Sequence, residues 1–213
     1  MKPNQIQYTH KATSKEYLVA LIYYPCFRKL LQSEISDYKE LQNWLSEKES
    51  SLRDEEKPLP SLKEIAQELK IDTTTLTKNL KSIYHDIIDL NEKQPNLFRK
   101  EGQKLCFLSF NYLDQYAHFN LGLDVLPKVG EGFHFGFVKP INGGDSFHVE
   151  DVVHSYENGI HEVRIYLTSE YPIVYMKLLK EKAYLHRDIS FSELLSSTNF
   201  SLQERLVKLH KNL

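Results

Sequence analysis

Short hydroxyl and lysine side chains gather between residues 73 and 81 of this 213-residue sequence. If the segment is helical, one side of it presents hydroxyls and two amines, from Thr74, Thr75, Thr77, Lys78 and Lys81. A helix of this kind can lie in the major groove of DNA, where hydroxyls reach base edges and lysines reach bases or phosphates. The chemistry that these residues would support is therefore recognition of double-stranded DNA, in which no covalent bond changes.

The flanking sequence predicts two short helices joined by a tight turn. Ser61 can cap the first helix, with Glu64 as its reciprocal partner in a capping box. Asp72 or Thr73 can cap the second helix. The positions expected to be buried are Ile65, Ala66, Leu69, Ile71, Leu76, Leu80 and Ile83. This spacing is typical of a helix-turn-helix, and the alternative is two ordinary amphipathic helices in a bundle.

These residues resemble the winged helix-turn-helix of GntR-type bacterial transcription regulators. The matching motifs are Leu59-Pro60-Ser61, Ala66-x-x-Leu69-x-Ile71 and Leu76-x-x-x-Leu80-x-x-Ile83. Lys70 stands where the family has a turn glycine, which adopts the left-handed conformation at little cost. The resemblance is limited to residues 58–108. It implies a winged DNA-binding domain followed by a C-terminal module for an effector or for dimerisation.

A wing is expected directly after the second helix. Residues 97–98 and 105–108 are apolar and flank a basic turn that contains Gly102, which fits two short strands. Arg99, Lys100 and Lys104 would then lie beside the DNA backbone. The complete expected interface assigns base contacts to Thr74, Thr75 and Lys78, and phosphate contacts to Ser61, Lys63, Lys81, Arg99, Lys100 and Lys104. An ordinary surface hairpin is the alternative to a wing.

Residues 127–168 predict a small, curved antiparallel sheet. Asn158-Gly159 is a preferred pair for a two-residue hairpin turn of type I′. This turn sets the register, with Tyr156 opposite His161, His154 opposite Val163 and Val152 opposite Ile165. Phe147 and Val149 then have the wrong parity for the apolar face, so a bulge or a bend is expected near Glu150-Asp151.

The fold expected from these patterns is α+β. It consists of N-terminal helices and a winged helix-turn-helix, followed by a small curved antiparallel β domain with C-terminal helices. The expected segments are a helical region at 1–57, the winged helix-turn-helix at 58–110, a packed junction at 111–126 and a β-rich module ending in helices at 127–213.

Motifs for catalysis and nucleotide binding are absent from the sequence. The glycines at 130, 132 and 136 miss the G-x-G-x-x-G spacing, and the sequence contains neither a P-loop motif nor a nucleophile elbow. The β region carries His134, His148, His154 and His161, and the register would bring His154 close to His161. Because no spacing demands a third ligand, we expect half-buried histidines, with no metal site, no cofactor and no enzyme activity.

Composition limits the possible partners and compartment. The net charge of −2 excludes a basic protein that coats nucleic acid, so DNA binding requires a local patch. Cys26 and Cys106 form no C-x-x-C pair, which favours a reducing compartment. No signal peptide is found, and the longest apolar stretch, residues 17–27, is about half of the roughly 20 residues that a membrane helix needs. We therefore expect a cytoplasmic protein without membrane contact.

The sequence thus predicts a sequence-specific DNA-binding protein, a transcription regulator of bacterial type. Such proteins usually pair to read two half-sites about 34 Å apart. We therefore expect a homodimer, with the C-terminal helices or residues 17–27 as the seam, and the resemblance implies a small-molecule effector. The alternative is a protein-interaction or assembly module that uses the winged fold as a scaffold without binding DNA.

Overall fold

A computed structural model describes residues 9–31, 38–54, 56–169, 174–196 and 206 of the chain. Residues 1–170 and residues 171–213 form two compact units. The second unit contains helices α8 (Val174–Leu185) and α9 (Phe191–Ser196). All other helices and strands described below belong to the first unit.

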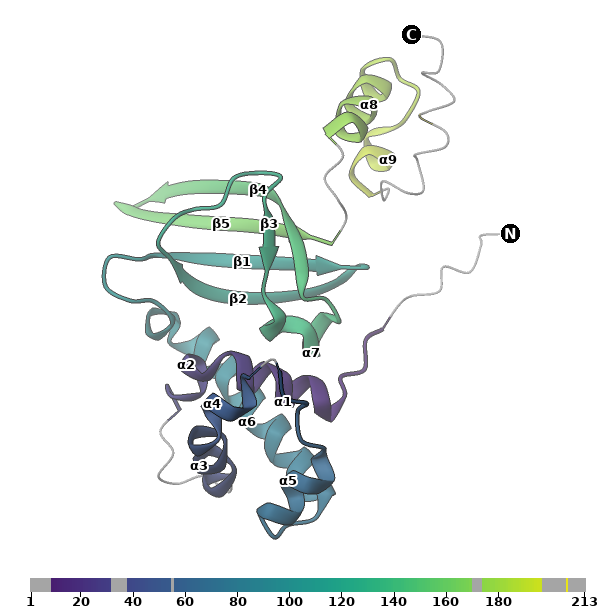
Figure 1. The fold of residues 1–213 in the computed structure, drawn as a ribbon. Helices are drawn as coiled ribbons and strands as arrows, with labels where there is room; N and C mark the ends of the chain where they lie inside the picture. The colour runs from purple at the N-terminus through teal and green to yellow at the C-terminus, as the bar shows by residue number, and fades with distance from the viewer. Residues whose placement is uncertain (1–8, 32–37, 55, 170–173, 197–205, 207–213) are drawn as a thin grey trace. The chain divides into compact units, whose positions relative to one another are not determined.

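The N-terminal part of the first unit is helical (Figure 1). Its helices are α1 (Ser14–Tyr23), α2 (Pro25–Arg28), α3 (Lys39–Glu47), α4 (Glu49–Leu52), α5 (Leu62–Glu68) and α6 (Thr73–Lys93). Thr13 caps α1 through a capping box with Glu16, and Pro25 begins α2 because its ring fixes φ and its missing N–H is not needed there. Helices α1–α6 lie on one side of a sheet (Figure 1).

The sheet has five strands in the order β2-β1-β5-β4-β3. The strands are β1 (Lys104–Tyr112), β2 (Gln115–Leu123), β3 (Gly132–His134), β4 (Ser146–Glu157) and β5 (Ile160–Thr168). Strands β1 and β5 are parallel, and the other neighbouring pairs are antiparallel. The protein is therefore a mixture of helices and a curled, mostly antiparallel sheet, as the α+β expectation requires.

The hairpin predicted between residues 97–98 and 105–108 is wrong. Residues 95–98 form a 3₁₀ turn, η2 (Pro95–Phe98), which begins at the proline. The turn buries Phe98 against Phe27 and Phe119, with ring centroids 5.4 and 5.3 Å apart, so burial of this ring replaces strand pairing. The hairpin that follows α6 is instead β1–β2, and Leu113 and Asp114 form its turn with φ of 49° and 63°.

Strand β1 connects parts of the chain that the sequence suggests are separate. It pairs with β2 on one edge and with β5 on the other. The expected junction, residues 111–126, contains the whole of β2, and strands β3–β5 come from the expected β-rich module. The expected boundaries at residues 110 and 126 therefore run through a single sheet.

The register predicted for the β4–β5 hairpin is confirmed. Tyr156 lies opposite His161, His154 opposite Val163, and Val152 opposite Ile165. The register shifts between Val149 and Asp151, which is the predicted bulge. Asn158 and Gly159 have φ of 50° and 77°, as a type I′ turn requires.

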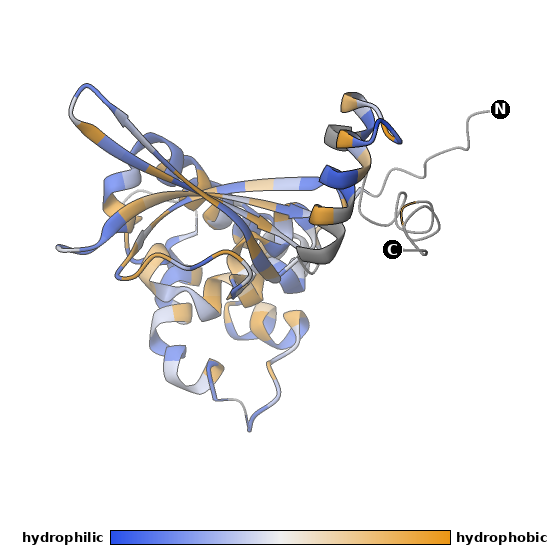
Figure 2. Cartoon of the chain, turned by 90° about the horizontal axis from the view of Figure 1, so that it is seen from above, coloured by the Kyte–Doolittle hydropathy of each residue, from blue (hydrophilic) through white to orange (hydrophobic). Residues whose placement is uncertain are grey.

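The core of the first unit lies between the helices and one face of the sheet. Figure 2 shows hydrophobic and hydrophilic residues alternating along the strands, so one face of the sheet is apolar. Aromatic rings fill much of the buried layer, including Tyr17, Phe27, Tyr84, Phe98, Phe110, Phe119, Phe135, Phe137 and Phe147. The Tyr84 hydroxyl donates to the carbonyl of Phe137 at 2.8 Å and so ties α6 to this layer.

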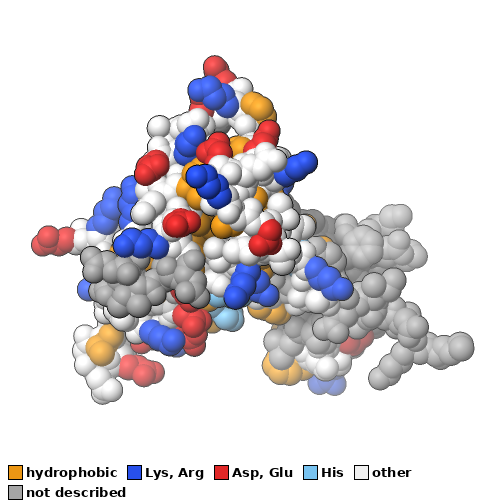
Figure 3. All heavy atoms as spheres, turned by 90° about the horizontal axis from the view of Figure 1, so that it is seen from below, with side chains coloured by type: hydrophobic (Ala, Val, Ile, Leu, Met, Phe, Trp, Pro, Cys, Tyr) orange, Lys and Arg blue, Asp and Glu red, His pale blue; other side chains and the backbone are white. Residues whose placement is uncertain are grey.

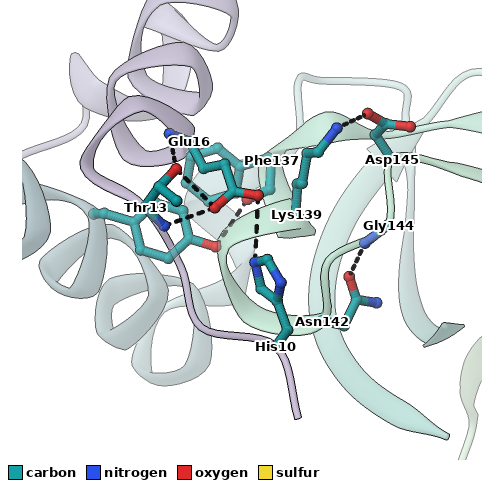
Figure 4. Close-up of polar contacts among 9 residues, drawn as sticks. His10, Thr13, Glu16, Phe137, Lys139, Asn142, Gly144 and Asp145 are labelled. Carbon is teal, nitrogen blue, oxygen red and sulfur yellow. Dashed lines mark hydrogen bonds and ion pairs between the residues drawn. The ribbon is translucent and has the colours of Figure 1, made fainter. Parts of the chain in front are cut away.

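A short segment, η3 (Gly136–Val138) with α7 (Lys139–Asn142), holds α1 and the sheet together (Figure 4). The Lys139 ammonium pairs with the Asp145 carboxylate at 2.5 Å, and the Asn142 side chain accepts from the amide of Gly144 at 3.0 Å. A Cβ at Gly144 would lie 2.5 Å from the Tyr112 ring, so this close approach requires glycine.

Candidate nucleic-acid interface

Both predicted caps are present in the α5–turn–α6 segment. The Ser61 hydroxyl accepts from the amide of Glu64 at 3.3 Å, while the Glu64 carboxylate accepts from the amide of Ser61 at 2.7 Å. Of the two candidates for the second cap, Asp72 is the one used, and one of its oxygens accepts from the amides of Thr74 and Thr75 at 2.8 Å each. Its other oxygen accepts from the Thr75 hydroxyl at 2.6 Å.

These caps limit what Ser61 and Thr75 can offer to DNA. The hydrogen bond from the Ser61 amide, followed by that from its hydroxyl, lowers the pKa of Glu64. The hydrogen bonds from the Thr75 hydroxyl and amide likewise lower the pKa of Asp72. Both carboxylates are therefore charged at neutral pH, and a phosphate approaching Ser61 would meet the charge of Glu64.

The turn between α5 and α6 contains one residue with a left-handed backbone conformation. Lys70 adopts φ of 55°, which is left-handed, and the amide of Ile71 donates to the carbonyl of Ala66 at 3.0 Å. A lysine thus occupies a left-handed position, which glycine would adopt at lower cost. Leu69 and Ile71 pack against the core, as predicted.

The outward face of the first turns of α6 carries Thr74, Lys78 and Lys81, which are all exposed. Within the described part of the chain, no ion pair involves Lys63, Lys78 or Lys81. Acidic residues on α6 begin only at Asp86, so the first half of the helix carries positive charge alone. Thr77 does not belong to this face, because its hydroxyl lies 3.1 Å from the Ser14 hydroxyl of α1.

The three cations of the expected wing lie at the other end of α6. Fifteen residues separate Lys78 from Lys93, which at 1.5 Å per residue is about 22 Å. Arg99 and Lys100 follow beyond η2, and Lys104 begins β1, where its ammonium donates to the carbonyl of His161 at 2.6 Å. The structure therefore separates the expected interface into two groups. The helix group lies at the start of α5 and α6 and consists of Ser61, Lys63, Thr74, Thr75, Lys78 and Lys81, and the sheet group consists of Arg99, Lys100 and Lys104.

Charges of both signs cover the helical side of the protein. Figure 3 shows Lys and Arg side chains interspersed with Asp and Glu side chains on this face. Some of the acids are engaged locally: the Glu68 carboxylate accepts from the Trp44 indole at 2.7 Å and lies 3.3 Å from the Lys48 ammonium. The outward residues of the first half of α6 therefore form a local positive surface within a face of mixed charge.

Arg164 is a neighbour of the sheet group that the sequence does not indicate. Parallel pairing places Phe107 of β1 directly opposite Arg164 of β5, and both line the same hollow as Arg99 and Lys104. The hairpin register assigns Arg164 to the outward face. Nothing in the spacing, however, indicates that β5 would lie beside β1, 57 residues earlier in the chain.

The predicted approach of two histidines is confirmed. Nδ1 of His154 lies 2.9 Å from Nε2 of His161, and the ring of Tyr156 stacks on His161 with centroids 4.3 Å apart. Among the residues that the structure describes, no group of three or more His, Cys, Asp or Glu side chains has an arrangement that could hold a metal ion.

None of the helices in the described ranges combines the length and apolar character needed to cross a membrane. Comparison with protein-family models, with curated proteins and with solved structures finds no match to this chain.

Proposed function

We propose that this protein binds double-stranded DNA in a sequence-specific manner through the first half of α6. The observation that carries the proposal is the outward face with Thr74, Lys78 and Lys81, which has no acidic neighbour on the helix and no intramolecular ion pair among the described residues. A helix that presents hydroxyls and unpaired amines at its N-terminal turns has the chemistry of a recognition helix.

The capped turn supports this proposal because it would hold α6 at a fixed angle to α5. Thr74 and Lys78 lie in the first turns and would reach base edges, while Lys81 and Lys63 would contact phosphates. The Thr75 hydroxyl donates to Asp72, so it can only accept a hydrogen bond from a base. Ser61 would act mainly by fixing the start of α5.

The expected phosphate contacts of Arg99, Lys100 and Lys104 require a longer site. A duplex seated on Lys78 would have to extend about 22 Å along α6 before it met these side chains. In our proposal the helix group therefore carries recognition. The near-neutral net charge of −2 agrees with a specific binder, since nonspecific binding would need a wider basic surface.

A protein-interaction scaffold is the second candidate function. The mixed charges of the helical face and the carboxylate of Glu64 at the start of α5 favour it, because both would repel a DNA backbone. In such a scaffold the same two helices would present Lys78 and Lys81 to an acidic protein surface.

Selection from a random duplex library, followed by fluorescence anisotropy on the enriched sequence, tests the DNA proposal. Lys78→Ala should weaken binding by about 1–3 kcal/mol, which is roughly five- to 150-fold in Kd, and should relax sequence preference at the contacted base pair. Lys81→Ala should weaken binding to all sequences and reduce the slope of log K against log salt by about 0.9.

Lys93→Ala is the matched control for these two variants. Lys93 lies in the last turn of α6 and its ammonium is 3.6 Å from Asp89, so its removal should leave binding unchanged. If the wild-type protein enriches no duplex and binds none at low salt, the DNA proposal fails. The scaffold is then the better account.

A further inference from the structure

A hollow lies where β1 and β5 begin, and its lining does not include the residues of the proposed DNA surface. Its volume is about 560 Å³, which is in the size range of small-molecule sites. We call it the β1–β5 hollow. It is lined by Pro95, Asn96, Arg99, Lys104, Leu105, Phe107, Asn120, Ile160, His161, Glu162, Val163 and Arg164.

Positive charge dominates this hollow although the protein as a whole is slightly acidic. Three cations, from Arg99, Lys104 and Arg164, face one carboxylate, from Glu162, so the local charge is +2 against −2 for the whole chain. Partial desolvation, followed by the charges of Lys104 and His154, lowers the pKa of His161, so this imidazole adds no charge at neutral pH. A concave site with this balance attracts anions.

The backbone fixes Arg99 at the rim of the hollow. A Cβ added at Gly122 of β2 would lie 2.4 Å from Cβ of Arg99, so Arg99 crosses the strand in direct contact with this glycine. The Gln103 side chain accepts from the amide of Lys100 at 2.8 Å and donates to Asp124 at 3.2 Å, which holds the loop after Arg99 in place. The guanidinium therefore extends from an anchored backbone position.

The other two cations are placed by strand pairing. Lys104 begins β1 and its ammonium donates to the carbonyl of His161 at 2.6 Å. Arg164 lies opposite Phe107 in the parallel β1–β5 pair, and its guanidinium is 3.6 Å from the Glu162 carboxylate. The three cations thus come from different parts of the chain, and Lys104 and Arg164 line one hollow because β1 pairs with β5.

The remaining lining is largely apolar, which distinguishes the site from a surface for a polymer backbone. Leu105, Phe107, Ile160 and Pro95 contribute carbon surface to the hollow. The Phe107 ring stacks on His118 with centroids 5.2 Å apart and an angle of 25° between the planes, which fixes the ring. A ligand that fits both parts of this lining has an anionic group and a flat apolar body.

We propose that the β1–β5 hollow binds a small organic anion, a phosphate or carboxylate attached to a flat apolar group. Arg99, Lys104 and Arg164 hold the anionic group, and Phe107 and Leu105 contact the apolar part. Glu162 limits the affinity for the anion, because its carboxylate pairs with the Arg164 guanidinium when no anion is bound. This proposal does not rest on DNA binding, since its residues and those of the α6 face are separate.

Isothermal titration calorimetry on the full-length protein at constant ionic strength tests the site. The probes are phenyl phosphate, benzoate and inorganic phosphate. Phenyl phosphate should bind more tightly than inorganic phosphate because only the former uses the apolar lining, and comparison with benzoate shows which anionic group the cations prefer. Absence of binding by all three probes at millimolar concentration overturns the proposal.

Three variants separate a built site from general attraction of anions. Arg164→Ala should weaken phenyl phosphate binding about tenfold or more, because a charge-assisted hydrogen bond is lost. Glu162→Gln should strengthen binding several-fold, because it removes the only carboxylate of the hollow and releases Arg164. Gly122→Ala should weaken binding without changing any charge, because it displaces Arg99.

Lys128→Ala removes an exposed cation outside the hollow and serves as the control. Its affinity for phenyl phosphate should equal that of the wild type. Circular dichroism and thermal melting establish that each variant is folded. If Arg164→Ala and Glu162→Gln bind with the wild-type affinity, the anion lies elsewhere and the assignment to this hollow is wrong.

Discussion

At the scale of single residues, Lys70 shows how a lysine serves in a position that suits glycine. Its φ of 55° is left-handed, which an L-residue adopts at a cost, and yet the turn forms because residues on both sides pack into the core. Lys70 itself is exposed, so its side chain meets no steric obstacle. The strain is therefore local to the backbone.

Lys70→Gly should stabilise the protein by about 0.5–1 kcal/mol, because glycine relieves this strain but gains freedom in the unfolded chain. Chemical denaturation measures the free energy of unfolding. Lys81→Gly is the control: Lys81 is also exposed but lies in the interior of α6, where glycine should destabilise by about 1 kcal/mol. If both variants were destabilised alike, Lys70 would carry no strain.

At the scale of elements, α6 has different tasks along its length. Its first half presents Thr74, Lys78 and Lys81 outward, whereas its last turns are attached to the sheet. The side-chain Nδ2 of Asn91 donates to the backbone carbonyl of Asn120 at 2.8 Å, and its Oδ1 accepts from the backbone N–H of Asn120 at 2.8 Å. Because β2 is an edge strand, Asn91 satisfies the edge as another strand would. The last turn of α6 is thus attached to β2 by a pair of hydrogen bonds.

The β4–β5 hairpin depends on its two-residue turn. Gly159→Val should destabilise the protein by about 1–3 kcal/mol, because a β-branched residue resists the φ of 77° found there. Gly132→Val in β3 is the control, since a Cβ at Gly132 meets no atom within 4 Å and its φ is not in the left-handed region. Thermal melting compares the two variants. Equal melting temperatures for Gly159→Val and the wild type would contradict the turn assignment.

At the scale of the whole molecule, the homodimer remains a prediction, and the fold reduces the number of surfaces that could form its interface. The expected seam at residues 17–27 is wrong in its main part, because Tyr17, Leu18 and Leu21 are buried in the core of the first unit. The second unit exposes apolar side chains on both of its helices, with Leu185 79% exposed and Phe191 58% exposed. Of the two expected seams, the C-terminal helices are therefore the one to test.

We expect a homodimer held by α8 and α9, because a helix-turn-helix monomer reads few base pairs and such proteins usually pair to read two half-sites about 34 Å apart. Analytical ultracentrifugation at micromolar concentration measures the mass, and Leu185→Asp should shift the protein to the monomer. Val125→Asp is the control, because Val125 is 82% exposed but lies in the first unit. A wild-type protein that sediments as a monomer with and without DNA would refute the dimer.

The sequence by itself determined the features that depend on near neighbours in the chain. Ser61 with Glu64, Asp72 with its two amides, the left-handed turn at Lys70 and the Asn158-Gly159 hairpin with its bulge all follow from contacts within a few residues or across one turn. Such contacts need little loop closure, so local residue types decide them.

Only the tertiary structure decided the pairings between distant segments. Phe98 lies in a 3₁₀ turn because its ring packs on Phe27. Strand β1 pairs in parallel with β5, and not with residues 97–98 as expected. Both outcomes depend on which apolar faces can be buried together, which no local pattern specifies. For the same reason the sequence indicated the outward residues of α6 but not the β1–β5 hollow. Its three cations line one site only after β1 and β5 have paired.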